Sequence, residues 1–99
     1  MISDHVDDLA SLRGQQRRKV FEPVDIHAGG AAVRAHLLNL SASGALVHSA
    51  IGPAPGTAIR LSIGGVIRSA RVVWRDGARF GIAFALPLGE AEVERVLGG

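Results

Sequence analysis

The chain has 99 residues and a mass of 10.3 kDa, which is the length of one domain rather than two. Apolar residues make up 47% of it, which excludes intrinsic disorder, and the lack of cysteine excludes disulfides, thiolate zinc sites and cysteine nucleophiles. The net charge of +2 is unevenly distributed, because residues 31–85 contain six arginines and a single acidic residue, Asp76.

Residues 1–12 form an acidic lead without the apolar segment of a secretory signal. We expect this lead either to be disordered or to form one or two helical turns capped by Ser3 or Asp4. Residues 13–19 are polar and basic, and we expect a loop or arm there. The chain lacks the run of about 20 apolar residues that a membrane span needs, so we expect a cytoplasmic protein without membrane insertion.

Residues 20–84 have the pattern of β structure, in which apolar and polar residues alternate between turn residues. We predict six strands, at residues 20–26, 32–40, 45–48, 58–63, 66–75 and 79–84. Pro23 marks the first strand as an edge strand or a bulged strand. Gly64-Gly65 and Asp76-Gly77 are dipeptides that favour tight hairpin turns between antiparallel strands.

Residues 89–97 are predicted to form a helix, since acidic residues come early and Val93, Val96 and Leu97 form an apolar stripe. Six short strands in so small a chain favour a barrel, because a closed sheet leaves no open edges. We therefore expect an all-β fold over residues 13–99, a six-stranded antiparallel β-barrel with a short C-terminal helix across one end.

The aromatic residues late in the chain are predicted to be core residues. Phe80, Ile82 and Phe84 alternate with polar or small residues, so their side chains should fill the barrel interior. Trp74 ends an alternating strand, and we interpret it as a buried indole rather than as a ligand contact.

The sequence contains none of the common catalytic motifs, neither HExxH nor a P-loop nor a serine-hydrolase elbow. His36 and His48 are expected to face each other across paired strands, but two ligands are fewer than a zinc site needs. Asp25 and Asp76 stand apart and form no carboxylate pair. We predict no enzymatic activity, no metal site and no cofactor.

Asn39-Leu40-Ser41-Ala42-Ser43-Gly44 follows an apolar strand and is typical of a turn. Asn and Ser side chains bond backbone amides nearby, and Gly44 is able to take a positive φ. This string is either an ordinary turn or a small concavity that presents an amide, hydroxyls and backbone N–H groups to a ligand.

Arg13-Gly14-Gln15-Gln16-Arg17 is followed by Arg18 and Lys19. This cluster is either a solvated group of charges or an arm that wraps an anion. Guanidinium groups clamp phosphate, stack on purines and bond the O6/N7 edge of guanine.

The combined pattern resembles the PilZ domain family, with an RxxxR arm, a D/N-x-S-x-x-G turn and two later motifs. The matching strings are Arg13-Gly14-Gln15-Gln16-Arg17, Asn39-Leu40-Ser41-Ala42-Ser43-Gly44, Val72-Val73-Trp74 and Phe80-Gly81-Ile82-Ala83-Phe84. The resemblance covers about residues 13–86. It implies a six-stranded barrel that binds the bacterial second messenger cyclic di-GMP and relays the signal to an effector protein.

The resemblance also assigns ligand-binding roles to individual residues of the arm. Arg13 and Arg17 would hold the phosphates and guanines, with Arg18 as a supplement. This arm is well placed if the first strand begins near Lys19 and displaced if it begins near Val24.

In the turn, the resemblance implies that Asn39 and Ser41 hydrogen-bond a guanine, and that Gly44 keeps the turn open for close approach of the ligand. Asn39 stands where many members have Asp, and it offers one acceptor and a donor pair instead of acceptors only.

Two other functions remain open. Glu22 stands near the arm, and an acid facing the phosphates would favour a degenerate PilZ adaptor that binds a protein partner without nucleotide. Binding of single-stranded nucleic acid is disfavoured, because only four aromatic residues are available for stacking and two of them alternate like core residues. We expect no DNA or RNA partner.

Overall fold

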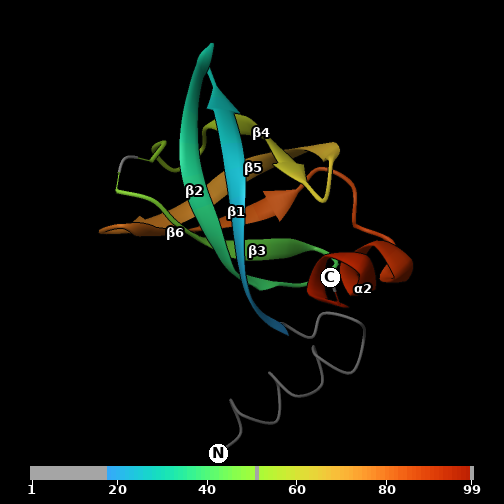
Figure 1. Cartoon of the computed structure of the whole chain (residues 1–99). Coiled ribbons are helices and arrows are strands. Elements are labelled where there is room, and N and C mark those ends of the chain that lie inside the picture. Colours follow the sequence, from blue (N-terminus) through green and yellow to red (C-terminus); the bar gives the residue numbers. More distant parts are fainter. Residues whose placement is uncertain (1–17, 51, 99) are drawn as a thin grey trace, which may run out of the picture.

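The computed structural model describes residues 18–50 and 52–98, and in this part of the chain six strands close into a barrel (Figure 1). Every pair of neighbouring strands is antiparallel, in the order β1-β2-β3-β6-β5-β4. The elements are β1 (Arg18–Ala28), β2 (Ala31–Leu40), β3 (Gly44–His48), β4 (Ala58–Ile63), β5 (Val66–Asp76), β6 (Arg79–Phe84) and α2 (Glu90–Gly98). The predicted barrel with a C-terminal helix is confirmed.

Strand β1 begins earlier than the sequence pattern predicts. Arg18 and Lys19, which we expected in the arm, are part of the strand and pair with β2. A bulge between Lys19 and Glu22 precedes Pro23, as the bulged alternative predicts. Pro23 also lies in the part of β1 that pairs with β2 and has no partner in β4. The lead predicted at residues 1–12 and the arm residues before Arg18 lie outside the described residues.

Glycine conformations set the two predicted hairpin turns. Gly64 and Gly65 have φ values of 57° and 82°, which is the left-handed pair that a type I′ turn requires. The second turn is shifted by one residue from the prediction, because Asp76 ends β5 and the turn residues are Gly77 and Ala78. Gly77 has a φ of 63°, and glycine at the first central position is typical of a type II′ turn.

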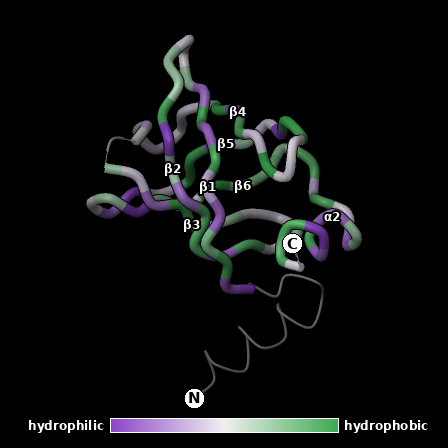
Figure 2. Tube along the Cα trace, viewed as in Figure 1, coloured by the Kyte–Doolittle hydropathy of each residue, from purple (hydrophilic) through white to green (hydrophobic). Residues whose placement is uncertain are grey.

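The core fills the barrel with residues that alternate along most of the strands, so that hydrophobic and hydrophilic positions follow one another along much of the tube (Figure 2). Phe80, Ile82 and Phe84 are buried, as predicted. The largest fully buried side chains are Phe80, Ile26, Leu37, Leu40, Leu61, Val47 and Val72.

Trp74 is not a core residue, contrary to the prediction. A bulge in β5 between Val72 and Trp74 interrupts the alternation, so Val72 is buried whereas Val73 and Trp74 are 53% and 41% exposed. The indole lies on the outer face of the barrel, against Gly81 of β6. A side chain at Gly81 would collide with this ring, which explains the glycine there.

Helix α2 packs against the barrel end at which β6 finishes. Leu88 and Val93 are buried in the hydrophobic core cluster, and Val96 packs against it. The helix begins after Gly89, whose N–H donates a hydrogen bond of 3.2 Å to the Glu92 carboxylate, as in a capping box. The apolar stripe predicted from the sequence thus closes one end of the barrel.

Replacing Leu61 by alanine should lower the free energy of unfolding by about 2–5 kcal/mol, because Leu61 is fully buried in β4 and the substitution leaves a cavity. Urea unfolding followed by circular dichroism measures this loss. Ile67→Ala is the matched control, since Ile67 is 64% exposed on the neighbouring strand and should change stability by less than about 0.5 kcal/mol. Equal effects of the two substitutions would contradict the assigned core.

Candidate ligand-binding site

The start of β1 and the Asn39–Gly44 turn lie side by side at the barrel end that α2 covers. Arg18 is the register partner of Leu40, and Lys19 is the partner of Asn39. The turn also contacts the segment that leads into α2, because the Leu88 N–H donates a 2.8 Å hydrogen bond to the Ala42 carbonyl. This end of the barrel therefore gathers basic residues, the polar turn and the helix (Figure 1).

The observed start of β1 agrees with the register in which the arm is well placed, with the first strand beginning near Lys19. The strand begins at Arg18, close to Lys19 and far from Val24. The chain that precedes Arg18 consequently joins the barrel next to the turn. Arg13 and Arg17 themselves lie outside the described residues.

Ser41 closes the turn with hydrogen bonds to Gly44. The Ser41 N–H donates to the Gly44 carbonyl over 2.9 Å, and the Ser41 hydroxyl lies 3.2 Å from both the Gly44 N–H and the Gly44 carbonyl. Ser41 is only 3% exposed. Its hydroxyl is thus a structural group of the turn.

Gly44 is required by the neighbouring strand rather than by its own backbone conformation. Its φ is not in the left-handed region, so the positive φ considered from the sequence does not occur. A Cβ atom at this position would collide with the backbone carbonyl of Ile82, because β3 and β6 approach closely here. The glycine therefore fixes where the turn meets β6.

Asn39 lies at a bulge in β2 and bridges to β3. Its Oδ1 atom accepts a 3.2 Å hydrogen bond from the Leu46 N–H, at the point where the register of the two strands shifts. Among residues 18–50 and 52–98, nothing accepts a hydrogen bond from its Nδ2 amide. The acceptor of this side chain thus holds the bulge, while its two amide donors have no partner in the described part of the chain.

Two ion pairs connect α2 to the barrel end. The Arg18 Nη1 atom lies 2.9 Å from Glu94 Oε2, and both side chains are about half exposed. Arg68 of β5 forms a second pair with Glu92 and is more buried. Arg18 is therefore the cation of this site that already has an anionic partner, and water screens that pair.

Glu22 is half-buried and pairs with Leu37 of β2. It lines a hollow of about 250 Å³ at the seam between β1 and β4, with Ser62 and Gly64 among its neighbours. The seam is open because only Ile26 and His27 of β1 pair with β4. Glu22, the residue on which the adaptor alternative rests, therefore lies at the seam between β1 and β4.

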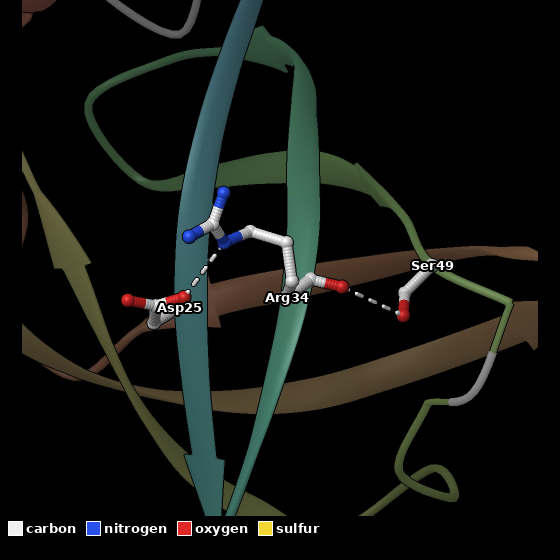
Figure 3. A network of polar contacts seen from close by, with 3 residues as sticks. All are labelled: Asp25, Arg34 and Ser49. Atoms are coloured by element: carbon white, nitrogen blue, oxygen red, sulfur yellow. Dashed lines mark hydrogen bonds and ion pairs between the residues drawn. The ribbon is translucent and has the colours of Figure 1, made fainter.

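Arg34 is neutralised within the sheet and adds no free charge to the site. Its Nε atom lies 3.0 Å from Asp25 Oδ1 across β1 and β2, and its carbonyl accepts a 3.3 Å hydrogen bond from the Ser49 hydroxyl (Figure 3). Both charged side chains are more than half exposed, so the pair contributes less than about 1 kcal/mol.

His36 and His48 are direct register partners across β2 and β3, as the sequence indicated. The residues that the structure describes contain no cluster of three histidine, cysteine or acidic residues that would hold a metal ion. His36 instead stacks on Phe21, with ring centroids 4.6 Å apart and an angle of 12° between the planes.

A second hollow, larger than the one at Glu22, was not predicted from the sequence. It has a volume of about 870 Å³ and lies over the outer faces of β4, β5 and β6, where Ile67 and Val73 meet Arg60 and Arg71. No helix within residues 18–50 and 52–98 is long and apolar enough to cross a membrane.

The PilZ domain family model matches residues 11–98 of the chain. Among solved structures, the chain is similar to the PilZ domain of CeSA from a cellulose-synthesizing bacterium, with 21% identity and a TM-score of 0.63. That match covers 83% of this chain and 95% of the other. A search of the curated proteins finds no match.

The structural similarity shows a shared fold, and the family match spans most of the chain. The chain belongs to the PilZ domain family. PilZ domains are binding and adaptor domains, and the known role of the family is to bind cyclic di-GMP.

Replacing Gly44 by alanine should destabilise the barrel by about 1–3 kcal/mol, because the added methyl group meets the backbone of β6. Thermal or urea unfolding measures the effect. Gly98→Ala is the control, since nothing lies within 4 Å of a Cβ atom there. A Gly44→Ala protein as stable as the control would show that β6 gives way without cost.

Proposed function

We propose that this chain is a receptor for cyclic di-GMP, which it binds at the barrel end formed by the start of β1 and the Asn39–Gly44 turn. The observation that carries the proposal is the pairing of Arg18 with Leu40. This pairing joins the basic RxxxR segment to the barrel directly beside the D/N-x-S-x-x-G turn. The family to which the chain belongs supports the choice of ligand.

The arm supplies the charges for the ligand's two phosphates in this proposal. Arg13 and Arg17 bind phosphate and guanine through their guanidinium forks, and Arg18 assists them from the barrel. Ordering the arm costs about 1–2 kcal/mol for each residue that becomes fixed. We therefore expect moderate affinity and ordering of the arm on binding.

The turn supplies the hydrogen bonds to a guanine. The free Nδ2 donors of Asn39 suit the O6 and N7 acceptors of that base. Ser41 and Gly44 hold the turn in the shape that presents these donors, since the Ser41 hydroxyl bonds Gly44. For Ser41 to hydrogen-bond the ligand directly, its hydroxyl must give up its hydrogen bond to Gly44 and bond the ligand instead.

The relay to an effector protein would run through Arg18 and α2. When Arg18 turns toward a phosphate, it leaves Glu94, and the acidic face of α2 loses its link to β1. The partner would read the combined surface of the ordered arm and the helix. A cytoplasmic location, a ligand-free adaptor role and the absence of other cofactors stay predictions from the sequence.

Isothermal titration calorimetry with cyclic di-GMP tests the proposal. The native chain should bind, and both Arg13→Ala and Arg17→Ala should lose detectable binding. The arm contains no apolar side chain that the core needs, so the free energy of unfolding should change by less than about 0.5 kcal/mol.

Arg79→Ala is the control for lost charge, because Arg79 lies in the β5–β6 hairpin at the opposite end of the barrel. It should bind like the native chain. If the native chain releases no heat at high ligand concentration, the receptor proposal fails and the adaptor alternative takes its place.

Replacing Glu94 by glutamine should strengthen binding by up to about fivefold, because it frees Arg18 from an exposed ion pair worth at most about 1 kcal/mol. The same calorimetric titration measures the change. Glu90→Gln removes a charge from the same helix at an exposed position without a described ion pair and is the control. Weaker binding by Glu94→Gln would contradict the exchange of partners at Arg18.

A further inference from the structure

Phe21 is a large aromatic side chain that is exposed to solvent on the outside of the barrel. It is 71% exposed, although burial of a phenyl ring is normally a source of stability. One face of the ring lies against the His36 imidazole, nearly parallel to it at a centroid distance of 4.6 Å. The other face of the phenyl ring is available for a further planar group.

The local backbone explains why the ring points outward. The β1 bulge between Lys19 and Glu22 contains Val20 and Phe21. Val20 packs against the core, so its neighbours Lys19 and Phe21 share the outer face of the barrel. Strand alternation and the stack on His36 therefore orient Phe21 before any ligand arrives.

Phe21 lies next to the proposed ligand site. Lys19 is the register partner of Asn39, and Phe21 is two residues further along the same strand and on the same face. An exposed aromatic ring thus shares the outer face of the barrel with one cation, Lys19, and with the free amide donors of Asn39.

We infer that Phe21, backed by His36, is a stacking platform for one purine base of the ligand. This inference rests on the proposed function, because it assigns a further contact to the same site. The base covers the open face of Phe21 and forms the third layer above the imidazole and the phenyl ring. The neighbouring cations hold the phosphates, while Asn39 bonds a base edge.

Stacking needs a flat π-face, whereas hydrophobic contact needs only apolar area. This difference separates the platform from an ordinary exposed phenylalanine. Phe21→Leu keeps the apolar side chain and removes the ring, and Phe21→Trp keeps a ring. The effect of a lost base–aromatic stack is about 5- to 150-fold in affinity.

The experiment is a calorimetric and proton NMR titration of the native chain and its Phe21 variants with cyclic di-GMP. Phe21→Ala and Phe21→Leu should weaken binding about 5- to 150-fold, and Phe21→Trp should bind like the native chain. The guanine H8 signal should move upfield in the native complex, because a stacked ring shields it, and this shift should disappear with Phe21→Leu. Ile67→Ala, which removes an exposed apolar side chain from β5, should leave the affinity unchanged.

The outcomes separate this inference from the proposed function. If the native chain does not bind cyclic di-GMP, the proposed function fails and the platform fails with it. If the native chain binds while Phe21→Ala and Phe21→Leu bind equally well, the receptor proposal stands and the platform is refuted. Urea unfolding of each variant excludes loss of fold, which an exposed position should not cause.

Discussion

The register of β1 on β2 is the constraint on which the site depends. The pairing of Arg18 with Leu40 brings the start of β1 to the polar turn, and the strand alternates regularly from there, with Val24 and Ile26 facing the core. A slip of one residue would exchange the inner and outer faces of β1, moving Val24 and Ile26 out of the core. The same apolar burial that stabilises the barrel therefore fixes the position of the site.

Several polar groups of the site serve the fold as well. Ser41 closes the turn, Asn39 holds a bulge with its carbonyl oxygen, and Arg18 ties α2 to β1. Such contacts orient the groups in advance and reduce the entropy that binding must overcome. The Arg18–Glu94 pair also links the proposed site to α2, so that ligand binding at Arg18 would change the surface of this helix.

The proposed site combines a part set by strand pairing with an arm that we propose from the sequence before Arg18. The turn and the outer face of β1 are set by strand pairing, and Phe21 is set by its stack on His36. The proposed arm adds charge only when a ligand repays the cost of ordering it. This division favours a receptor whose surface differs between the free and bound forms.

The strands and the helix could be predicted from the sequence because their apolar residues follow simple periods. Phe80, Ile82 and Phe84 alternate through β6, and Val93 and Val96 recur at helical spacing in α2. The order of the basic segment and the turn also indicated the PilZ domain family, because both motifs are short and local.

Bulges account for what the sequence did not predict. An extra residue changes the face of the next side chain, so Trp74 is exposed although its position suggested a core residue. The need for glycine at Gly44 comes from the β6 backbone, a contact between distant segments that no local pattern encodes.

The most direct test of the account is an NMR titration that follows each backbone amide while cyclic di-GMP is added. The account predicts the largest shift changes at residues 18–21 and 39–44, with little change in the β5–β6 hairpin around Gly77. Changes confined to the hollow over β4, β5 and β6, or no changes at all, would contradict a nucleotide site at the start of β1.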